Sequence, residues 1–594
     1  MKTFRILMVS NVRPSRTWNF ANRILREVPG TEICGIVQRS TRSIPWVQQL
    51  IAAGITRKIP DVPGFGCKVR LLIASAFDKI ADRLLWLVRG CPAPLNNSRF
   101  AVESLIRECS KTGWPLAVTG EGEEAGAATR ICHGDVDLAI LLGDFSAMPE
   151  LWANASSGCV RTCNYRLSSE RGSGTRGTLL SIEHLAAGTG IPCKIFSLVL
   201  PWQPLDGLLG FTLKSDLIAD DLLLQTSVSL LCGDPASASA AVLQWANKIL
   251  TPSVTQWKGI ERHTSQTEPK RKRCRSTWKL CLDTLLLFSP SVIGRNWRRR
   301  MSGRYPVLIL AHHLVSDRPH RMGVPTEIFW RQVLFLRKHY RIASLSEAVE
   351  LLRSGQVRVP TVVLTFDDGY GDNFLNLRAV AHEAGISPTL FITTAPVETH
   401  REFDHDLVTG TTGFLPLTWD QIQYWNARGA EFGSHTRTHF DCGFVDPEKL
   451  RPEIVGSRDD LEAQLKKPVE FFAFPFGKPK NMSSEAMDMA ASTYRHFVSS
   501  FGGESFPKAG ELQSHLHRKK FYSSQWELEL ELQSVFDFVD AAKEHLHPQV
   551  TQALKHSDSA QRRQGYAFEQ GKLEIGASIG NSQARVPREP RCSH

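Results

Sequence analysis

A run of apolar and β-branched residues that ends in two adjacent carboxylates constrains the fold of this chain most. Residues 362–370 read Val-Val-Leu-Thr-Phe-Asp-Asp-Gly-Tyr, and the acids are Asp367 and Asp368. Such a run is typical of a strand buried on both faces of a parallel sheet, and barrel enzymes carry their chemistry at the carboxyl ends of such strands. Neighbouring side chains leave a strand end in different directions, so one carboxylate can bind a metal while the other accepts a proton. Asp-Asp-Gly alone also fits an ordinary turn.

Two histidines four residues apart follow further along the chain. Residues 433–439 read Gly-Ser-His-Thr-Arg-Thr-His. On a helical turn this spacing brings His435 and His439 to one face, where both imidazoles can bind one ion. With Asp368 they form a set of two histidines and one carboxylate, which leaves coordination positions open for water and substrate. The alternative is a pair of solvated loop histidines, and the acid pair argues against it.

A third stretch, residues 471–477, reads Phe-Phe-Ala-Phe-Pro-Phe-Gly, an apolar strand broken by Pro and Gly. In this order, the three stretches resemble the motifs of the polysaccharide deacetylases of the NodB-homology family. That family's Thr-Phe-Asp-Asp-Gly, His-Ser/Thr-x-x-His and aromatic-Pro-aromatic-Gly motifs match residues 365–369, 435–439 and 474–477. The resemblance runs from about Tyr305 to about Tyr522 and implies a distorted (β/α) barrel within a deacetylase domain over residues 305–545.

The resemblance also implies a role for each residue of the site. Asp368, His435 and His439 would bind a divalent ion, and their mixed nitrogen and oxygen ligands favour Zn²⁺, with Co²⁺ and Ni²⁺ as alternatives. Asp367 would accept a proton from the attacking water. The backbone N–H of Phe476 would stabilise the oxyanion.

The predicted general acid lies at the end of an apolar strand over residues 307–315, which carries His312 and His313. Some branches of the deacetylase family have an aromatic-His pair here, and the match places the acid at His313. A packing role for one of the two histidines is the alternative. Two positions depart from the family: many relatives carry an Arg that orients the base where this chain has Ala473, and the late Leu-x-His motif is reduced to Leu516-His517.

The first 250 residues alternate apolar strands with helical stretches, which indicates a Rossmann-like, doubly wound α/β domain. The predicted strands are Arg5–Val9, Glu32–Val37, Pro115–Val118, Asp137–Leu142 and Cys159–Thr162. The region contains no Gly-x-Gly-x-x-Gly motif, so a dinucleotide site is unsupported.

This N-terminal region resembles, more weakly, the N-terminal domain of the formyltransferases. The resemblance lies in the first strand and helix, in residues 136–144, and in residues 158–160 leading to Arg171-Gly172. Where that family carries an Asn-x-His pair and a following Pro, this chain has Arg161, Cys163 and Ser168, and Asp206 stands near the family's catalytic Asp. The polarising carboxamide and the imidazole are therefore missing. We predict that residues 1–250 form a formyltransferase-like domain without transferase activity.

A basic segment joins the two halves. Residues 258–304 hold 13 Lys and Arg against 3 acidic residues, a net charge of +10 out of a formal +11 for the whole chain. We predict a solvated basic linker over residues 251–304. Nucleic-acid binding is disfavoured because no aromatic stacking pattern accompanies the charge. Peripheral contact with an anionic membrane is a secondary hypothesis, because residues 278–288 read as an apolar helix inside the basic segment.

Cysteine usage and the chain ends bear on location. Thirteen cysteines, an odd number with no Cys-x-x-Cys pair, are typical of a reducing compartment. The N-terminal residues are apolar only briefly before Asn11 and Arg13, so they lack the core of a signal peptide. No run reaches the ~20 apolar residues of a membrane span. We predict a cytoplasmic protein, with membrane association as the secondary hypothesis, and a disordered polar tail over residues 546–594.

Two classes of function are compatible with these patterns. The first is a metal-dependent hydrolase, a carbohydrate N-deacetylase that removes an acetyl or formyl group from amino sugars of a polysaccharide or glycan precursor. The second is a non-catalytic carbohydrate-binding or regulatory protein built on the same folds, supported by the altered first domain and by Ala473 in place of Arg. All three predicted metal ligands are present, which favours the hydrolase.

Overall fold

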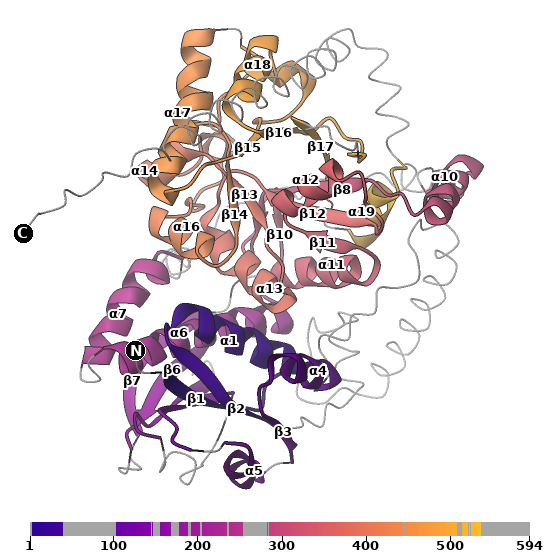
Figure 1. The fold of residues 1–594 in the computed structure, drawn as a ribbon. Helices are drawn as coiled ribbons and strands as arrows, with labels where there is room; N and C mark the ends of the chain where they lie inside the picture. The colour runs from indigo at the N-terminus through magenta and orange to yellow at the C-terminus, as the bar shows by residue number, and fades with distance from the viewer. Residues whose placement is uncertain are drawn as a thin grey trace, which may run out of the picture.

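Two large β-sheets organise the molecule: a mixed sheet in the N-terminal part and a closed parallel barrel in the C-terminal part (Figure 1). The computed structural model describes residues 3–39, 102–120, 122–132, 134–143, 145, 155–167, 177–187, 192–201, 203, 205–233, 237–253, 282, 284–444, 446–507, 514–520, 522 and 524–535. The predicted tail over residues 546–594 lies outside the described residues, as do residues 254–281 of the predicted linker.

The N-terminal sheet has seven strands. In spatial order they are β3 (Leu116–Thr119), β2 (Thr31–Arg39), β1 (Phe4–Ser10), β4 (Leu138–Leu142), β5 (Cys159–Leu167), β6 (Gly177–Leu185) and β7 (Pro192–Pro201). Strands β1 to β5 run parallel and correspond to the five predicted strands. Strands β6 and β7 extend the sheet antiparallel; the sequence analysis did not predict them, because polar residues such as Ser181 and Glu183 interrupt the apolar pattern of β6.

Helices cover both faces of this sheet. The helices α1 (Pro14–Glu27), α4 (Val102–Thr112) and α6 (Leu208–Cys232) pack on one face, where Ile6 and Met8 are buried. The helix α5 (Glu124–Ile131) packs on the other face, against Leu7 and Val9. This division follows from the alternation of side chains along a strand. The strand order reverses between β1 and β4, as in doubly wound sheets; the finer Rossmann-like and formyltransferase-like assignments stay predictions.

The C-terminal sheet closes on itself, which confirms the predicted barrel. The ring consists of β8 (Val307–His312), β12 (Thr361–Phe366), β13 (Thr389–Ile392), β14 (Glu431–Ser434), β15 (Phe471–Ala473), β16 (His496–Ser499) and β17 (His515–Lys520). All pairs are parallel, and β8 closes the ring between β17 and β12. The short strand β11 (Arg341–Ala343) pairs only with the first half of β12, which makes the barrel irregular.

Local sequence signals set the ends of the barrel helices. The side chain of Ser344 accepts a hydrogen bond from Glu347 at the start of α12 (Leu345–Arg353), and Thr418 and Gln421 form a capping box at the start of α16 (Trp419–Asn426). Asp446 caps α17 (Pro447–Leu465). The other long helices around the barrel are α11 (Thr326–His339), α13 (Asn376–Ala384) and α18 (Ser484–Thr493).

The two parts pack against each other through a shared core. One cluster of buried apolar residues includes members of α1 and α6 together with members of α11, α13 and α16, and Figure 1 shows α1, α6 and α7 (Ala238–Ile249) facing the barrel. At the centre of the contact, the fully buried Asp221 of α6 accepts hydrogen bonds from Arg23, Arg378 and Tyr424. Among the described helices, none is long and apolar enough to cross a membrane.

Candidate active site

The acid pair lies at the carboxyl end of β12, where the sequence placed it. Asp367 and Asp368 are both buried, and the N–H of Asp367 donates to the carbonyl of His312 at 2.9 Å. Asp368 has φ = +71°, a left-handed conformation that a non-glycine residue adopts at a cost. Gly369 follows with φ = +90°, and a Cβ at this position would lie 2.9 Å from the side chain of Ile392. This tight turn directs the two carboxylates in different directions.

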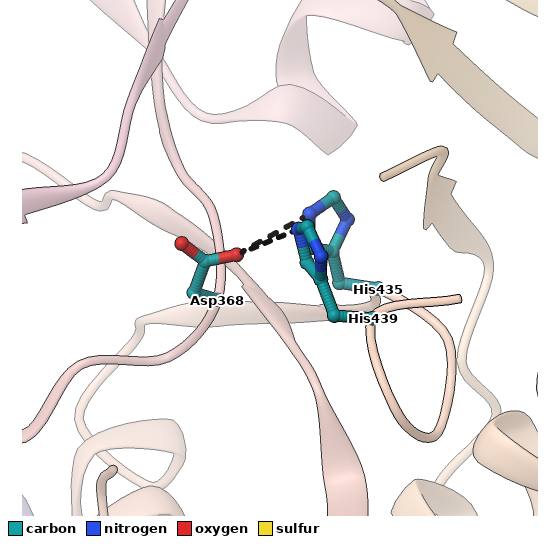
Figure 2. Close-up of side chains that lie close together, drawn as sticks. All are labelled: Asp368, His435 and His439. Atoms are coloured by element: carbon teal, nitrogen blue, oxygen red, sulfur yellow. Dashed lines mark ion pairs between the residues drawn. The ribbon is translucent and has the colours of Figure 1, made fainter. Parts of the chain in front are cut away.

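Three predicted ligands converge in front of this turn (Figure 2). Asp368 Oδ1 lies 3.5 Å from Nε2 of His435 and 3.4 Å from Nε2 of His439, and one ligand atom from each residue lies within 4.8 Å of the others. Metal-to-ligand distances of about 2.0–2.2 Å would place neighbouring tetrahedral ligands about 3.4 Å apart. The three side chains are therefore spaced as ligands of a single ion would be.

The two histidines do not share a helical turn, so the physical reason given for their convergence was wrong. Residues 435–439 form a loop after β14, and within it Thr436 and His439 both have φ = +63°. The loop is held from behind by Glu453 of α17, whose carboxylate accepts hydrogen bonds from the N–H groups of Arg437 and Thr438. These contacts bend the loop so that both imidazoles point at Asp368.

The electrostatics of the three residues also suit a cation. Both carboxylate oxygens of Asp368 are buried, and neither accepts a hydrogen bond from a described residue. Burial, followed by the charges of Asp367 and Asp406, raises the pKa of Asp368, and burial lowers the pKa of His439. A buried polar atom without a partner is costly unless something satisfies it. A divalent ion fits these donors, since it would satisfy both the carboxylate and the neutral imidazoles.

The ring of His435 is also oriented for this role. Its Nδ1 lies 2.8 Å from the backbone carbonyl of Ala473, so a proton on Nδ1 leaves Nε2 free to face Asp368. The site thereby uses Ala473, which stands where many members of the resembled family carry an Arg, through its backbone carbonyl.

An arginine that the sequence analysis missed binds Asp367. Arg518 in β17 is buried, and its Nη1 lies 2.6 Å from Oδ1 of Asp367. Burial opposes the charge of Asp367, but Arg518, together with His435 and His313, outweighs it and lowers the pKa of Asp367 to about 2. The strand period of two was the available signal: Leu516 belongs to the barrel core, so Arg518 faces the same interior, next to the acids.

The two histidines after β8 have different surroundings. His312 is buried and stacks on Phe366 with a centroid distance of 4.7 Å, and burial lowers its pKa to about 3. His312 is therefore the packing histidine of the two. His313 is half-buried, and a positive charge on it is among the causes that lower the pKa values of Asp367 and His439. His313 thus lies beside the cluster, where the prediction put it.

Phe476 forms the opposite side of the site. Its ring is half-exposed and lies 4.9 Å from the ring of His439, edge to face. The residue has φ = +60°, and its backbone N–H donates to no acceptor in the part of the chain that the structure describes. Asp368, Thr436, His439 and Phe476 all adopt left-handed conformations, and backbone strain of this kind concentrates at functional sites.

Comparison with known proteins identifies the domain around this site. Residues 354–494 match the family model described as Polysaccharide deacetylase. The C-terminal part carries a polysaccharide deacetylase domain. A protein of Bacillus subtilis (strain 168), named as polysaccharide deacetylase YxkH, is 24% identical over 174 residues, which cover 29% of this chain and 56% of that relative. The match thus spans little more than half of the relative.

Solved structures are also similar to part of the chain. Streptococcus pyogenes deacetylase PplD in complex with acetate is 21% identical, with a TM-score of 0.33, and the match covers 39% of this chain and 98% of PplD. IcaB from Ammonifex degensii is 17% identical, with a TM-score of 0.33, and the match covers 38% of this chain and 97% of IcaB.

The deacetylase domain contains a second histidine cluster that no sequence motif predicted. His405 in α15 (Asp404–Leu407) has its Nε2 3.7 Å from Oδ2 of Asp368 and 2.8 Å from the hydroxyl of Tyr370. That hydroxyl donates to Asp406 at 2.7 Å, and Asp406 in turn lies 3.2 Å from Nε2 of His320. His405 therefore faces the carboxylate oxygen of Asp368 that points away from His435 and His439.

The acid near the formyltransferase-like position serves the contact between the two parts. The side chain of Asp206 is buried and pairs with Lys214 of α6, whose Nζ lies 2.6 Å from Oδ2 of Asp317 in the deacetylase domain. Arg161 pairs with Glu183 of the neighbouring strand, and Cys163 is buried. The N-terminal positions thus have structural partners, and the resemblance to formyltransferases stays a prediction.

Proposed function

We propose that this chain is a metal-dependent hydrolase that removes an N-acyl group, acetyl or formyl, from an amino sugar of a polysaccharide or glycan precursor. The observation that carries the proposal is the convergence of Asp368, His435 and His439 beside an ionised Asp367, inside a polysaccharide deacetylase domain. Zn²⁺ is the ion that two imidazoles and one carboxylate favour. Bound there, it would supply Lewis acidity and lower the pKa of a bound water toward ~7.

Asp367 is the proposed general base. Its carboxylate is held by Arg518 at 2.6 Å and stays ionised far below neutral pH, because its pKa is about 2. Arg518 occupies one oxygen of the carboxylate, which leaves the other to accept a proton from the attacking water. Asp368, the next residue, faces the two histidines instead. Asp368 would therefore bind the metal, and Asp367 would transfer the proton.

Phe476 and His313 would complete the reaction on the substrate side. The backbone N–H of Phe476 would donate to the oxygen of the acyl carbonyl as negative charge develops on it. His313 would donate a proton to the nitrogen of the amino sugar as the bond to the acyl carbon breaks. The products are then acetate or formate and a free amine, which conserves every atom of the amide and the water.

Arg518 weakens the case for a non-catalytic binding protein. Ala473 in place of Arg had suggested a base without its orienting cation. Arg518 binds Asp367 from a different strand, so the base keeps a buried guanidinium partner. This buried pair favours the hydrolase over the binding protein.

The experiment is acetate and formate release by the zinc-loaded protein from N-acetyl and N-formyl amino-sugar oligomers. We expect one of the two acids to be released by the wild type. Asp367→Asn should lower the rate at least about 100-fold with unchanged zinc content, because the carboxamide keeps the shape of the side chain but cannot accept the proton.

His313→Gln separates the acid from the base, and His400→Asn, at an exposed loop position, is the matched control. We expect a lower rate in the first variant and an unchanged rate in the second. Silence from a zinc-loaded wild type across the substrate panel would instead support the binding protein.

A further inference from the structure

The segment before the barrel exposes an unusual number of apolar side chains. In the described part of the chain, 15 large apolar residues are exposed, and 6 of them lie between residues 282 and 301. They are Leu282, Leu285, Phe288, Ile293, Trp297 and Met301. Single exposed apolar residues are normal, but a cluster of this size on one segment indicates a surface that binds something.

Three of the six, Ile293, Trp297 and Met301, lie on α10 (Pro290–Ser302), and clear signals define both ends of this helix. Ser289 caps the helix through the N–H of Val292, Pro290 occupies the first turn, and Gly303 ends it with φ = +59°. In Figure 1, α10 lies at the outer edge of the barrel, on the right. Because both ends of the helix are capped, each of its faces carries a defined set of side chains.

One face of α10 docks on helix α19 (Gln525–Leu532) and the residues that follow it. Val292 packs in a small buried cluster with Leu287, Leu530 and Val535. The amide of Asn296 donates to Oε1 of Gln533 at 2.8 Å and is buried. This face holds the helix in place, so the orientation of the remaining faces is determined.

The outward face of α10 combines apolar and cationic side chains. Ile293, Trp297 and Met301 follow at intervals of four residues, which lines them up along the helix, and Trp297 and Met301 are 61% and 69% exposed. Beside them, Arg298 and Arg304 are exposed, and neither forms an ion pair with a described residue. We call Ile293, Trp297, Met301, Arg298 and Arg304 the α10 surface.

We propose that the α10 surface binds an anionic lipid bilayer and anchors the protein to it peripherally. The helix has no acidic residue, and the exposed Arg298 and Arg304 beside its apolar stripe are complementary to phosphate-rich, negatively charged headgroups. Trp suits this boundary because its ring is apolar and its N–H is polar. In the sequence, residues 258–281 precede this segment and carry eight Lys and Arg against two acids.

This arrangement also distinguishes a bilayer from a protein partner. A protein interface of this kind would need carboxylates placed opposite Arg298 and Arg304, whereas a bilayer surface supplies anions at every position. An interfacial helix buries one apolar face at the boundary between headgroups and acyl chains while its cations stay among the headgroups. Both parts of that geometry are present on one helix here.

The test is co-sedimentation of the full chain with vesicles. We expect binding to vesicles of phosphatidylcholine mixed with phosphatidylserine and little binding to phosphatidylcholine alone. The double variant Trp297→Ser, Met301→Ser should bind at least about tenfold more weakly, since it loses most of the apolar stripe. The matched control Leu243→Ser, at an exposed position of α7, should bind as the wild type does. Arg298→Ala should bind the anionic vesicles roughly fivefold more weakly than the wild type does, because it loses one cation near the headgroups.

Three outcomes would overturn the proposal. The first is a wild type that binds neither kind of vesicle. The second is a double variant that binds as well as the wild type. That outcome would show that the α10 surface is not needed for binding to the vesicles. The third is concentration-dependent self-association that the double variant abolishes, which would make a second copy of the chain the occupant. Because the substituted side chains are exposed, an unchanged unfolding temperature shows that each variant is folded.

Discussion

At the scale of single residues, two adjacent carboxylates have opposite surroundings. Asp367 faces the guanidinium of Arg518, and its pKa is about 2. Asp368 has no hydrogen-bond donor among the described residues, and its pKa is raised by burial and then by the neighbouring acids. Environments that separate the behaviour of two acids in this way assign them different roles. Asp367 can act as a base, and Asp368 needs a cation.

Arg518→Met should shift the pH dependence of activity. Arg518 lowers the pKa of Asp367 against the effect of burial, so its removal raises that pKa. A base with a raised pKa is protonated at higher pH, and we therefore expect the acidic limb of kcat/KM to move upward by about one to three pH units. Arg495→Met, at a partly exposed ion pair with Glu470, should leave the profile unchanged. An unshifted acidic limb in the Arg518 variant would argue that Asp367 is not the base.

His405→Ala should weaken metal binding. His405 faces Oδ2 of Asp368 and joins it to Tyr370 and Asp406. Removal of groups that orient a metal ligand typically costs about 10–100-fold in metal affinity. Competition with a chelator measures this directly, and His400→Asn is the control because His400 is exposed and lies outside the cluster. Equal zinc affinity of the His405 variant and the wild type would show that the cluster has no part in the metal site.

At the scale of elements, the loop over residues 435–439 depends on a helix that follows it in sequence. Glu453 of α17 accepts hydrogen bonds from two backbone N–H groups and from the hydroxyl of Thr438. The strained residues of the loop persist because these contacts fix their conformation. The helix α17 thus positions the histidines without touching the site itself.

Glu453→Ala should therefore reduce both stability and metal affinity. The substitution leaves two partly buried loop N–H groups without their acceptor, and each costs up to about 1–3 kcal/mol. Glu448→Ala, on the exposed face of the same helix, should have little effect. Urea denaturation and zinc titration of the two variants provide the comparison. Normal zinc affinity in a Glu453 variant would show that the loop holds its shape without this contact.

At the scale of the whole molecule, buried charges tie the N-terminal part to the barrel. Asp221 of α6 contacts Arg23 from α1 and Arg378 from α13. Lys214 joins Asp206 to Asp317 in the same contact. Because these groups are buried, each needs its partner from the other part. The two parts should therefore unfold together.

Asp221→Asn should destabilise the protein by about 3–5 kcal/mol, because it leaves the buried Arg378 without its counter-charge and leaves Arg23 with Glu27 alone. Asp459→Asn, in an exposed pair with Arg458, should cost less than about 1 kcal/mol. Thermal unfolding of both variants tests this. Separate transitions for the N-terminal part and the barrel are expected only in Asp221→Asn. A stability change no larger than that of the control would contradict the interface role.

The same residue gives the molecule a predictable response to acid. Burial disfavours the charge of Asp221, but Arg378 and Arg23 outweigh it, so its pKa lies well below the ordinary value of 3.8. A carboxylate with a depressed pKa stabilises the folded state above its unfolded pKa, and that contribution is lost as the pH falls. Below about pH 4, the wild type should therefore lose stability more steeply than Asp221→Asn.

Sequence patterns predicted the barrel, its acid pair and its histidines because each depends on local order. The continuous apolar run before Asp367 required a buried parallel strand, and the structure confirms it. The convergence of His435 and His439 was predicted, but from a shared helical turn. In the structure, a loop held by Glu453 brings the two histidines together. Arg518 and His405 were missed, since their roles arise from contacts across more than 30 residues of sequence. Long-range contacts of single polar residues leave no periodic trace in a sequence.

Release of the acyl product, acetate or formate, against zinc equivalents added to the chelator-treated protein tests the central claim most directly. If Asp368, His435 and His439 hold the ion on which Asp367 depends, activity should be absent without metal and should reach its plateau at one equivalent. Asp368→Ala should stay inactive at every zinc concentration. Full activity of the metal-free protein, or of Asp368→Ala, would contradict the account.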